Sequence, residues 1–94
     1  MYKKRIIELL DERATIDDNN VGSLNKVWEN LVSQFTDNDD ENEIIEFLDS
    51  LNDEQLEYAS EVFEEINDRL GNSKSFVEKL DTLKKKHPNA SLGI

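Results

Sequence analysis

Residues 51–71 read LNDEQLEYASEVFEEINDRLG and combine two patterns that favour a helix with two different faces. Between Asp53 and Asp68 there are seven carboxylates and no basic side chain. At 100° per residue the carboxylates fall within an arc of about 120°, and the apolar residues occupy a separate arc of similar width. One side of such a helix packs into the protein, and the other faces water. The segment therefore predicts a single amphipathic helix over residues 53–70.

Signals for the ends of helices support this reading and extend it along the chain. Asn52 and Gln55 have the spacing of a capping box, and Gly71 is typical of the residue just past a helix end. Ser23 is a candidate N-cap for a helix with apolar residues at helical spacing, and Pro88 ends the last helical segment. We expect helices over approximately residues 2–13, 23–35, 41–51, 53–70 and 74–86.

Composition limits the fold to a small helical domain. The chain has 94 residues with one proline and three glycines, and no turn of the Asn-Gly or Asp-Gly type separates alternating apolar runs. We expect one all-α domain over residues 1–94, a compact bundle of four to five short helices. The chain has no cysteine, so disulfides and Cys-based zinc sites are excluded. No apolar run approaches the roughly 18 residues that a membrane span needs, and we expect a cytoplasmic protein.

The negative charge is concentrated in the middle of the chain. Of the formal net charge of -11, residues 37–70 contribute 14 acids and one base, and the remainder has 8 acids and 10 bases. Such a field repels nucleic acid and anionic membranes and attracts cationic proteins. We therefore expect a basic protein partner, with no nucleic acid and no membrane among the partners.

The acidic face of residues 53–70 is the candidate binding surface. In a continuous helix, four pairs of acids at i,i+4 would repel one another at a cost on the order of 1–2 kcal/mol in total. A solvated surface is the ordinary explanation of a run of charges, but interspersed lysines would have avoided this repulsion. The predicted partner-binding residues are Asp53, Glu54, Glu57, Tyr58, Glu61, Glu64, Glu65 and Asp68.

No catalytic or metal-binding motif is found. A calcium-binding EF-hand loop starting at Asp37 would need glycine at position 6 and glutamate at position 12, where the chain has Asn42 and Leu48. His87 is the one histidine and lies at a predicted helix end, where we expect it to act as a cap. Without a second histidine or a cysteine, no nucleophile–base pair is available. The sequence predicts a non-enzyme with no cofactor, no metal and no catalytic residue.

The second half of the chain resembles a known family. Residues 44–88, IIEFLDSLNDEQLEYASEVFEEINDRLGNSKSFVEKLDTLKKKHP, are similar to small all-helical immunity proteins of bacterial polymorphic toxin and contact-dependent inhibition systems. The matching pieces are SLNDEQLEY, SEVFEEI and SFVEKLDTLKKKHP, and the first half agrees through VWENL. One departure is RLGNSKSF, where a glycine replaces the more usual glutamine-serine-lysine linker.

The resemblance implies an antitoxin that neutralises a cognate secreted toxin domain by binding it directly. An acidic helix face would suit a basic toxin, and we expect the protein to be a monomer when free. Two other readings remain: a helical adaptor or regulatory protein that binds a basic partner or self-associates, and a small carboxylate-based enzyme or metal protein.

Overall fold

The computed structural model describes residues 3–37 and 41–92. In these residues it contains six helices: α1 (Lys3–Thr15), α2 (Val21–Phe35), α3 (Glu41–Asp49), α4 (Asp53–Ser60), α5 (Phe63–Arg69) and α6 (Lys74–Lys86). The predicted all-α class is confirmed. The predicted count of four to five helices is wrong, because the helix expected over residues 53–70 is two helices. The predicted start of the first helix at residue 2 lies outside the described residues.

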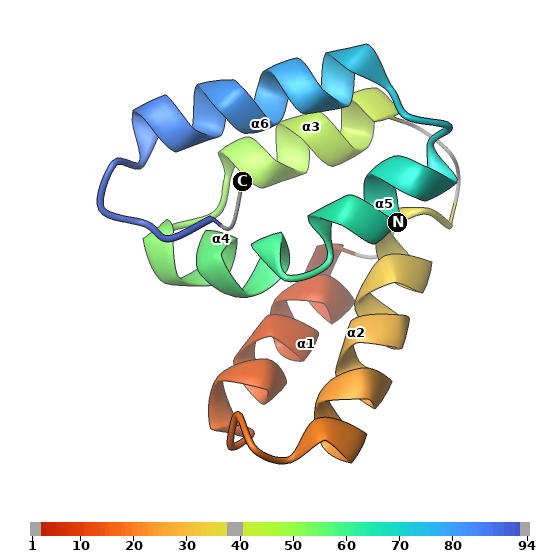
Figure 1. Cartoon of the computed structure of the whole chain (residues 1–94), viewed down its shortest axis with the longest axis vertical. Helices are drawn as coiled ribbons and strands as arrows, with labels where there is room; N and C mark the ends of the chain where they lie inside the picture. The colour runs from red at the N-terminus through yellow and green to blue at the C-terminus, as the bar shows by residue number, and fades with distance from the viewer. Residues whose placement is uncertain (1–2, 38–40, 93–94) are drawn as a thin grey trace.

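The helices form two pairs with α4 and α5 between them (Figure 1). The α1 and α2 helices make an antiparallel hairpin, and α3 and α6 lie side by side. Edge-to-face aromatic contacts connect these parts, with ring centroids 5.9 Å apart between Phe35 and Phe47 and 6.2 Å apart between Phe63 and Phe76. All of these rings belong to one buried apolar cluster. The first of these contacts joins α2 to α3, and the second joins α5 to α6.

The caps set most of the helix boundaries. At the start of α4, the Asn52 side chain accepts from the Gln55 backbone N–H at 2.8 Å, and the Gln55 side chain accepts from the Asn52 N–H at 3.0 Å, so the predicted capping box is confirmed. The N-cap of α2 is Asn20, whose side chain accepts from the Ser23 N–H at 3.3 Å. The predicted Ser23 cap is therefore wrong by three residues. Gly71 has a φ of 76° just after α5, as expected of a helix-ending glycine.

The regular helical hydrogen bonding changes at the break between α4 and α5. In a continuous helix the Glu57 carbonyl would accept the Glu61 N–H. Instead the Ser60 hydroxyl donates to the Glu57 carbonyl at 2.6 Å, and the Glu61 N–H pairs with the Tyr58 carbonyl at 3.3 Å. Serine hydroxyls that bond to a preceding carbonyl compete with the helix in this way and often bend it. The chain makes a tight turn here, so α5 starts in a new direction.

Candidate protein-binding site

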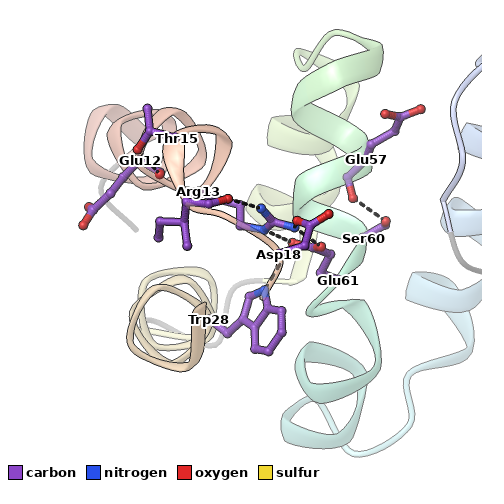
Figure 2. Close-up of polar contacts among 9 residues, drawn as sticks. Glu12, Arg13, Thr15, Asp18, Trp28, Glu57, Ser60 and Glu61 are labelled. Carbon is purple, nitrogen blue, oxygen red and sulfur yellow. Dashed lines mark hydrogen bonds and ion pairs between the residues drawn. The ribbon is translucent and has the colours of Figure 1, made fainter. Parts of the chain in front are cut away.

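Glu61 lies at the turn between α4 and α5 and forms an ion pair with Arg13 of α1 (Figure 2). The pair is bidentate: Arg13 Nε donates to Glu61 Oε1 at 2.6 Å, and Arg13 Nη2 donates to Glu61 Oε2 at 2.8 Å. The Trp28 indole N–H, from α2, donates to the same Oε1 at 3.2 Å. One carboxylate thus joins the α1–α2 hairpin to the α4–α5 turn.

Arg13 is the buried charged residue of the core, with 6% of its surface exposed. Besides Glu61, its guanidinium donates to Asp18 Oδ1 at 3.0 Å and lies 5.0 Å from the centroid of the Tyr58 ring. The hydrogen bond with Glu61 raises the pKa of Arg13 above its usual range, against the lowering effect of burial, and Asp18 adds to the rise. Arg13 is therefore held as a charged group whose charge is satisfied inside the protein.

This arrangement removes Glu61 from the predicted acidic face. Its side chain is 28% exposed, and both oxygens accept hydrogen bonds from α1 and α2. Figure 2 shows the Glu57 carboxylate of α4 pointing away from Arg13. The expectation of one uninterrupted stripe of seven outward carboxylates is wrong, because the helix turns at Glu61 and Arg13 neutralises it.

Two more of the predicted residues contact the segment that follows α6. Asp53 Oδ1 lies 2.5 Å from Nδ1 of His87, the C-cap of α6, as predicted for that histidine. Glu57 Oε1 accepts from the backbone N–H of Ser91 at 2.9 Å, and the neighbouring Leu92 is buried in the core. These two carboxylates help to hold residues 87–92 against α4.

The other four carboxylates of the predicted face are exposed, and their side chains have no ion pair or hydrogen bond among the described residues: Glu54, Glu64, Glu65 and Asp68. Two lysines of α6 pair with α3 instead. Lys79 Nζ lies 2.6 Å from Asp49 of α3, and Lys86 Nζ lies 3.8 Å from the same residue. We call these four residues the free acidic surface: Glu54 lies in the first turn of α4, and the other three lie on α5.

The turn also reduces the repulsion that the sequence predicted. Glu61 and Glu65 no longer share one helix, and Arg13 neutralises Glu61. Glu64 and Asp68 still face each other at i,i+4 within α5, at a cost of about 0.2–0.5 kcal/mol. Electrostatic strain in the fold is therefore a weaker argument for binding than the absence of partners on the free acidic surface.

A groove that the sequence did not predict lies beside this surface. It has a volume of about 720 Å³ and is lined by α4, α5, α6 and the residues after α6. We call it the α5–α6 groove. Tyr58 and Glu64 line it together with three residues of α6, Val77, Leu80 and Asp81. Val77 lies next to the buried Phe76 but remains 44% exposed, and nothing in the sequence pattern separates the two.

Arg13 was also missed as a site residue. It continues the apolar register of Ile6, Leu9 and Leu10 on α1, and a charged residue in such a register indicates a buried ion pair. Its partner lies 48 positions away, and no local pattern points to it.

The comparisons with known proteins give no relative. No protein-family model matches the chain, and no curated protein or solved structure is significantly similar to it. The resemblance of residues 44–88 to immunity proteins therefore stays a prediction from the quoted motifs. Within the described ranges, no group of three or more acidic or histidine side chains is placed to hold a metal ion. None of the described helices is long and apolar enough to cross a membrane.

Proposed function

We propose that this protein is a non-enzymatic inhibitory binding module: an immunity protein that neutralises a basic toxin domain in the cytoplasm of the cell that makes it. The observation that carries the proposal is the free acidic surface of Glu54, Glu64, Glu65 and Asp68, which has no partner among the described residues. The resemblance of residues 44–88 to helical immunity proteins supports the same function.

The physical basis of the proposal is electrostatic attraction. With a net charge of -11, the protein attracts a cationic domain from a distance and speeds its association. The carboxylates of α5 then meet lysines or arginines that a toxin would otherwise use to hold a polyanionic substrate. Binding alone blocks the toxin, and no chemistry by this chain is needed.

The fold gives this surface a fixed position. The α5 helix is anchored through Phe63 and Ile66, which are 3% and 0% exposed, and its acids point away from that core. A rigid surface loses little conformational entropy when a partner docks on it. Tyr58, one of the predicted partner-binding residues, is half-buried beside Arg13 and also lines the α5–α6 groove.

Co-expression with the toxin tests the proposal. If a gene for a large secreted protein with a variable C-terminal domain lies immediately upstream, that domain is the candidate toxin. We expect this protein to rescue the growth of cells that express the domain. The variant Glu64→Lys/Asp68→Lys should rescue poorly.

The matched control is Asp11→Lys/Glu12→Lys, which changes the net charge equally on exposed positions of α1. It should rescue growth like the unchanged protein, with folding of all variants checked by circular dichroism. Failure of the unchanged protein to rescue growth would contradict the proposed function.

A further inference from the structure

The α5–α6 groove combines an apolar floor with acidic walls. Its apolar lining includes Phe63 and Leu80, which are 3% and 5% exposed, and Val77, which is 44% exposed. An apolar side chain that remains open to water at the edge of a groove gains from being covered by another apolar group. The groove therefore offers a partner hydrophobic contact that the free acidic surface does not.

The walls of the groove bear negative charge on both sides. Glu57 and Glu64 line it from α4 and α5, and Asp81 lines it from α6. Glu64 and Asp81 have no side-chain partner among the described residues, while Glu57 uses only Oε1 for Ser91. No lysine, arginine or histidine is among the lining residues. Carboxylates from three helices, α4, α5 and α6, therefore line the groove.

We propose that the α5–α6 groove is the seat for a basic amphipathic segment of the partner protein. An apolar side chain of that segment covers Val77, and lysines or arginines on either side of it pair with Glu64 and Asp81. The inference rests on the proposed function and deepens it, because it names the contact surface and the chemistry of the segment that fills it. It adds Val77 and Asp81 to the binding residues.

The charge of the groove decides between possible occupants. A second copy of this chain would bring its own net charge of -11 against the same acidic walls, so self-association through this face is opposed. A neutral apolar peptide would leave Glu64 and Asp81 in a partly desolvated groove without a counter-charge, which is unfavourable. A basic segment with an apolar residue satisfies both the floor and the walls.

Peptide titration of the full, isotope-labelled chain tests the proposal without requiring the natural partner. The probe is a capped synthetic peptide in which leucine alternates with lysine and arginine. Two comparison peptides replace the leucines by serine or the basic residues by glutamate. We expect amide shifts concentrated around Phe63, Glu64, Val77 and Asp81 with the first peptide, much weaker binding with the serine peptide and no binding with the glutamate peptide.

Substitutions then distinguish binding in the groove from attraction by the overall negative charge of the protein. Asp81→Lys and Val77→Ser should each weaken binding of the first peptide by about tenfold or more, equivalent to about 1.4 kcal/mol. The matched control for Asp81→Lys is Glu78→Lys, an exposed position of α6 outside the groove, which should weaken it much less.

Three results would overturn the inference. The first is an equal loss of peptide binding in Asp81→Lys and Glu78→Lys. The second is unchanged peptide binding in Val77→Ser. The third is a set of amide shifts that clusters around Glu54 and Asp68, or no amide shifts at millimolar peptide. All three leave the growth-rescue experiment free to succeed, so failure of the groove is distinguishable from failure of the proposed function. Dimerisation of the free protein with the groove residues protected would instead identify a second copy as the occupant.

Discussion

The ion pair between Arg13 and Glu61 gives the sharpest prediction about the fold, tested by Glu61→Gln. The substitution keeps the size of the side chain and removes its charge, so Arg13 loses its bidentate partner while its own side chain is only 7% exposed. Breaking a buried ion pair from one side costs about 3–5 kcal/mol.

Two features of the structure reduce that cost. The Glu61 side chain is 28% exposed, and Asp18 remains 3.0 Å from Arg13 Nη2. Glutamine also keeps one oxygen that can accept from Arg13 or Trp28. We therefore expect a loss of about 2 kcal/mol in the free energy of unfolding. For a domain of this size the loss corresponds to a fall of about 8–16 °C in Tm.

Urea unfolding followed by circular dichroism and Trp28 fluorescence measures this loss. Glu64→Gln is the matched control, because it makes the same chemical change at an exposed position without a partner and should stay within about 0.5 kcal/mol of the unchanged protein. In the double variant Arg13→Met/Glu61→Gln the buried charge is also removed, so its loss should be smaller than the sum of the two single losses by about 1 kcal/mol or more. If Glu61→Gln were as stable as Glu64→Gln, the ion pair would not hold the α4–α5 turn and the reasoning would be refuted.

Three further predictions concern single residues. Asn52→Ala removes the capping box of α4 and should cost about 1 kcal/mol in a thermal or urea melt, whereas an unchanged stability would mean that the core alone fixes the start of α4. Gly71→Ala should cost about 1–2 kcal/mol, because Gly71 has a φ of 76° that alanine adopts with strain, although no atom lies within 4 Å of the added Cβ. Gly22→Ala, inside α2 and with equally open space, should instead stabilise by about 0.5–1 kcal/mol, and the same sign for both glycines would contradict this conformational argument.

The elements that sequence patterns located correctly are those set by local chemistry. The capping box at Asn52, the glycine at 71 and the cap at His87 each act within a few residues of the helix end that they define. The start of α2 was misplaced because Asn20 and Ser23 are both good caps, and the chain uses the earlier one.

Local sequence patterns could not predict the break between α4 and α5, and the reason is physical. Residues 53–70 have helical periodicity throughout, and serine and valine occur inside many helices. What stabilises the turn is the contact of Glu61 with Arg13 and Trp28, which lie 48 and 33 positions away. The same long-range pairing decided which carboxylates stayed free, so the sequence located the acidic region but could not separate Glu61 from Glu64.

This separation also determines which variants can test binding. Charge reversal at Glu61 would place a lysine against Arg13 and disturb the fold, so a loss of binding there would be ambiguous. Reversals at Glu64 and Asp68 avoid this problem, because their side chains contact no partner among the described residues.

The most direct test of the central claim, that the free acidic surface draws in a basic partner, is the association rate of the candidate toxin domain. Stopped-flow mixing at low and at physiological salt would be followed by fluorescence for the unchanged protein, for Glu64→Lys/Asp68→Lys and for Asp11→Lys/Glu12→Lys. We predict an association rate that falls as salt rises, and about a tenfold or greater loss at low salt in the α5 variant alone, since steering by charge is strongest there. Equal rates for the two variants, or no dependence on salt, would contradict the account.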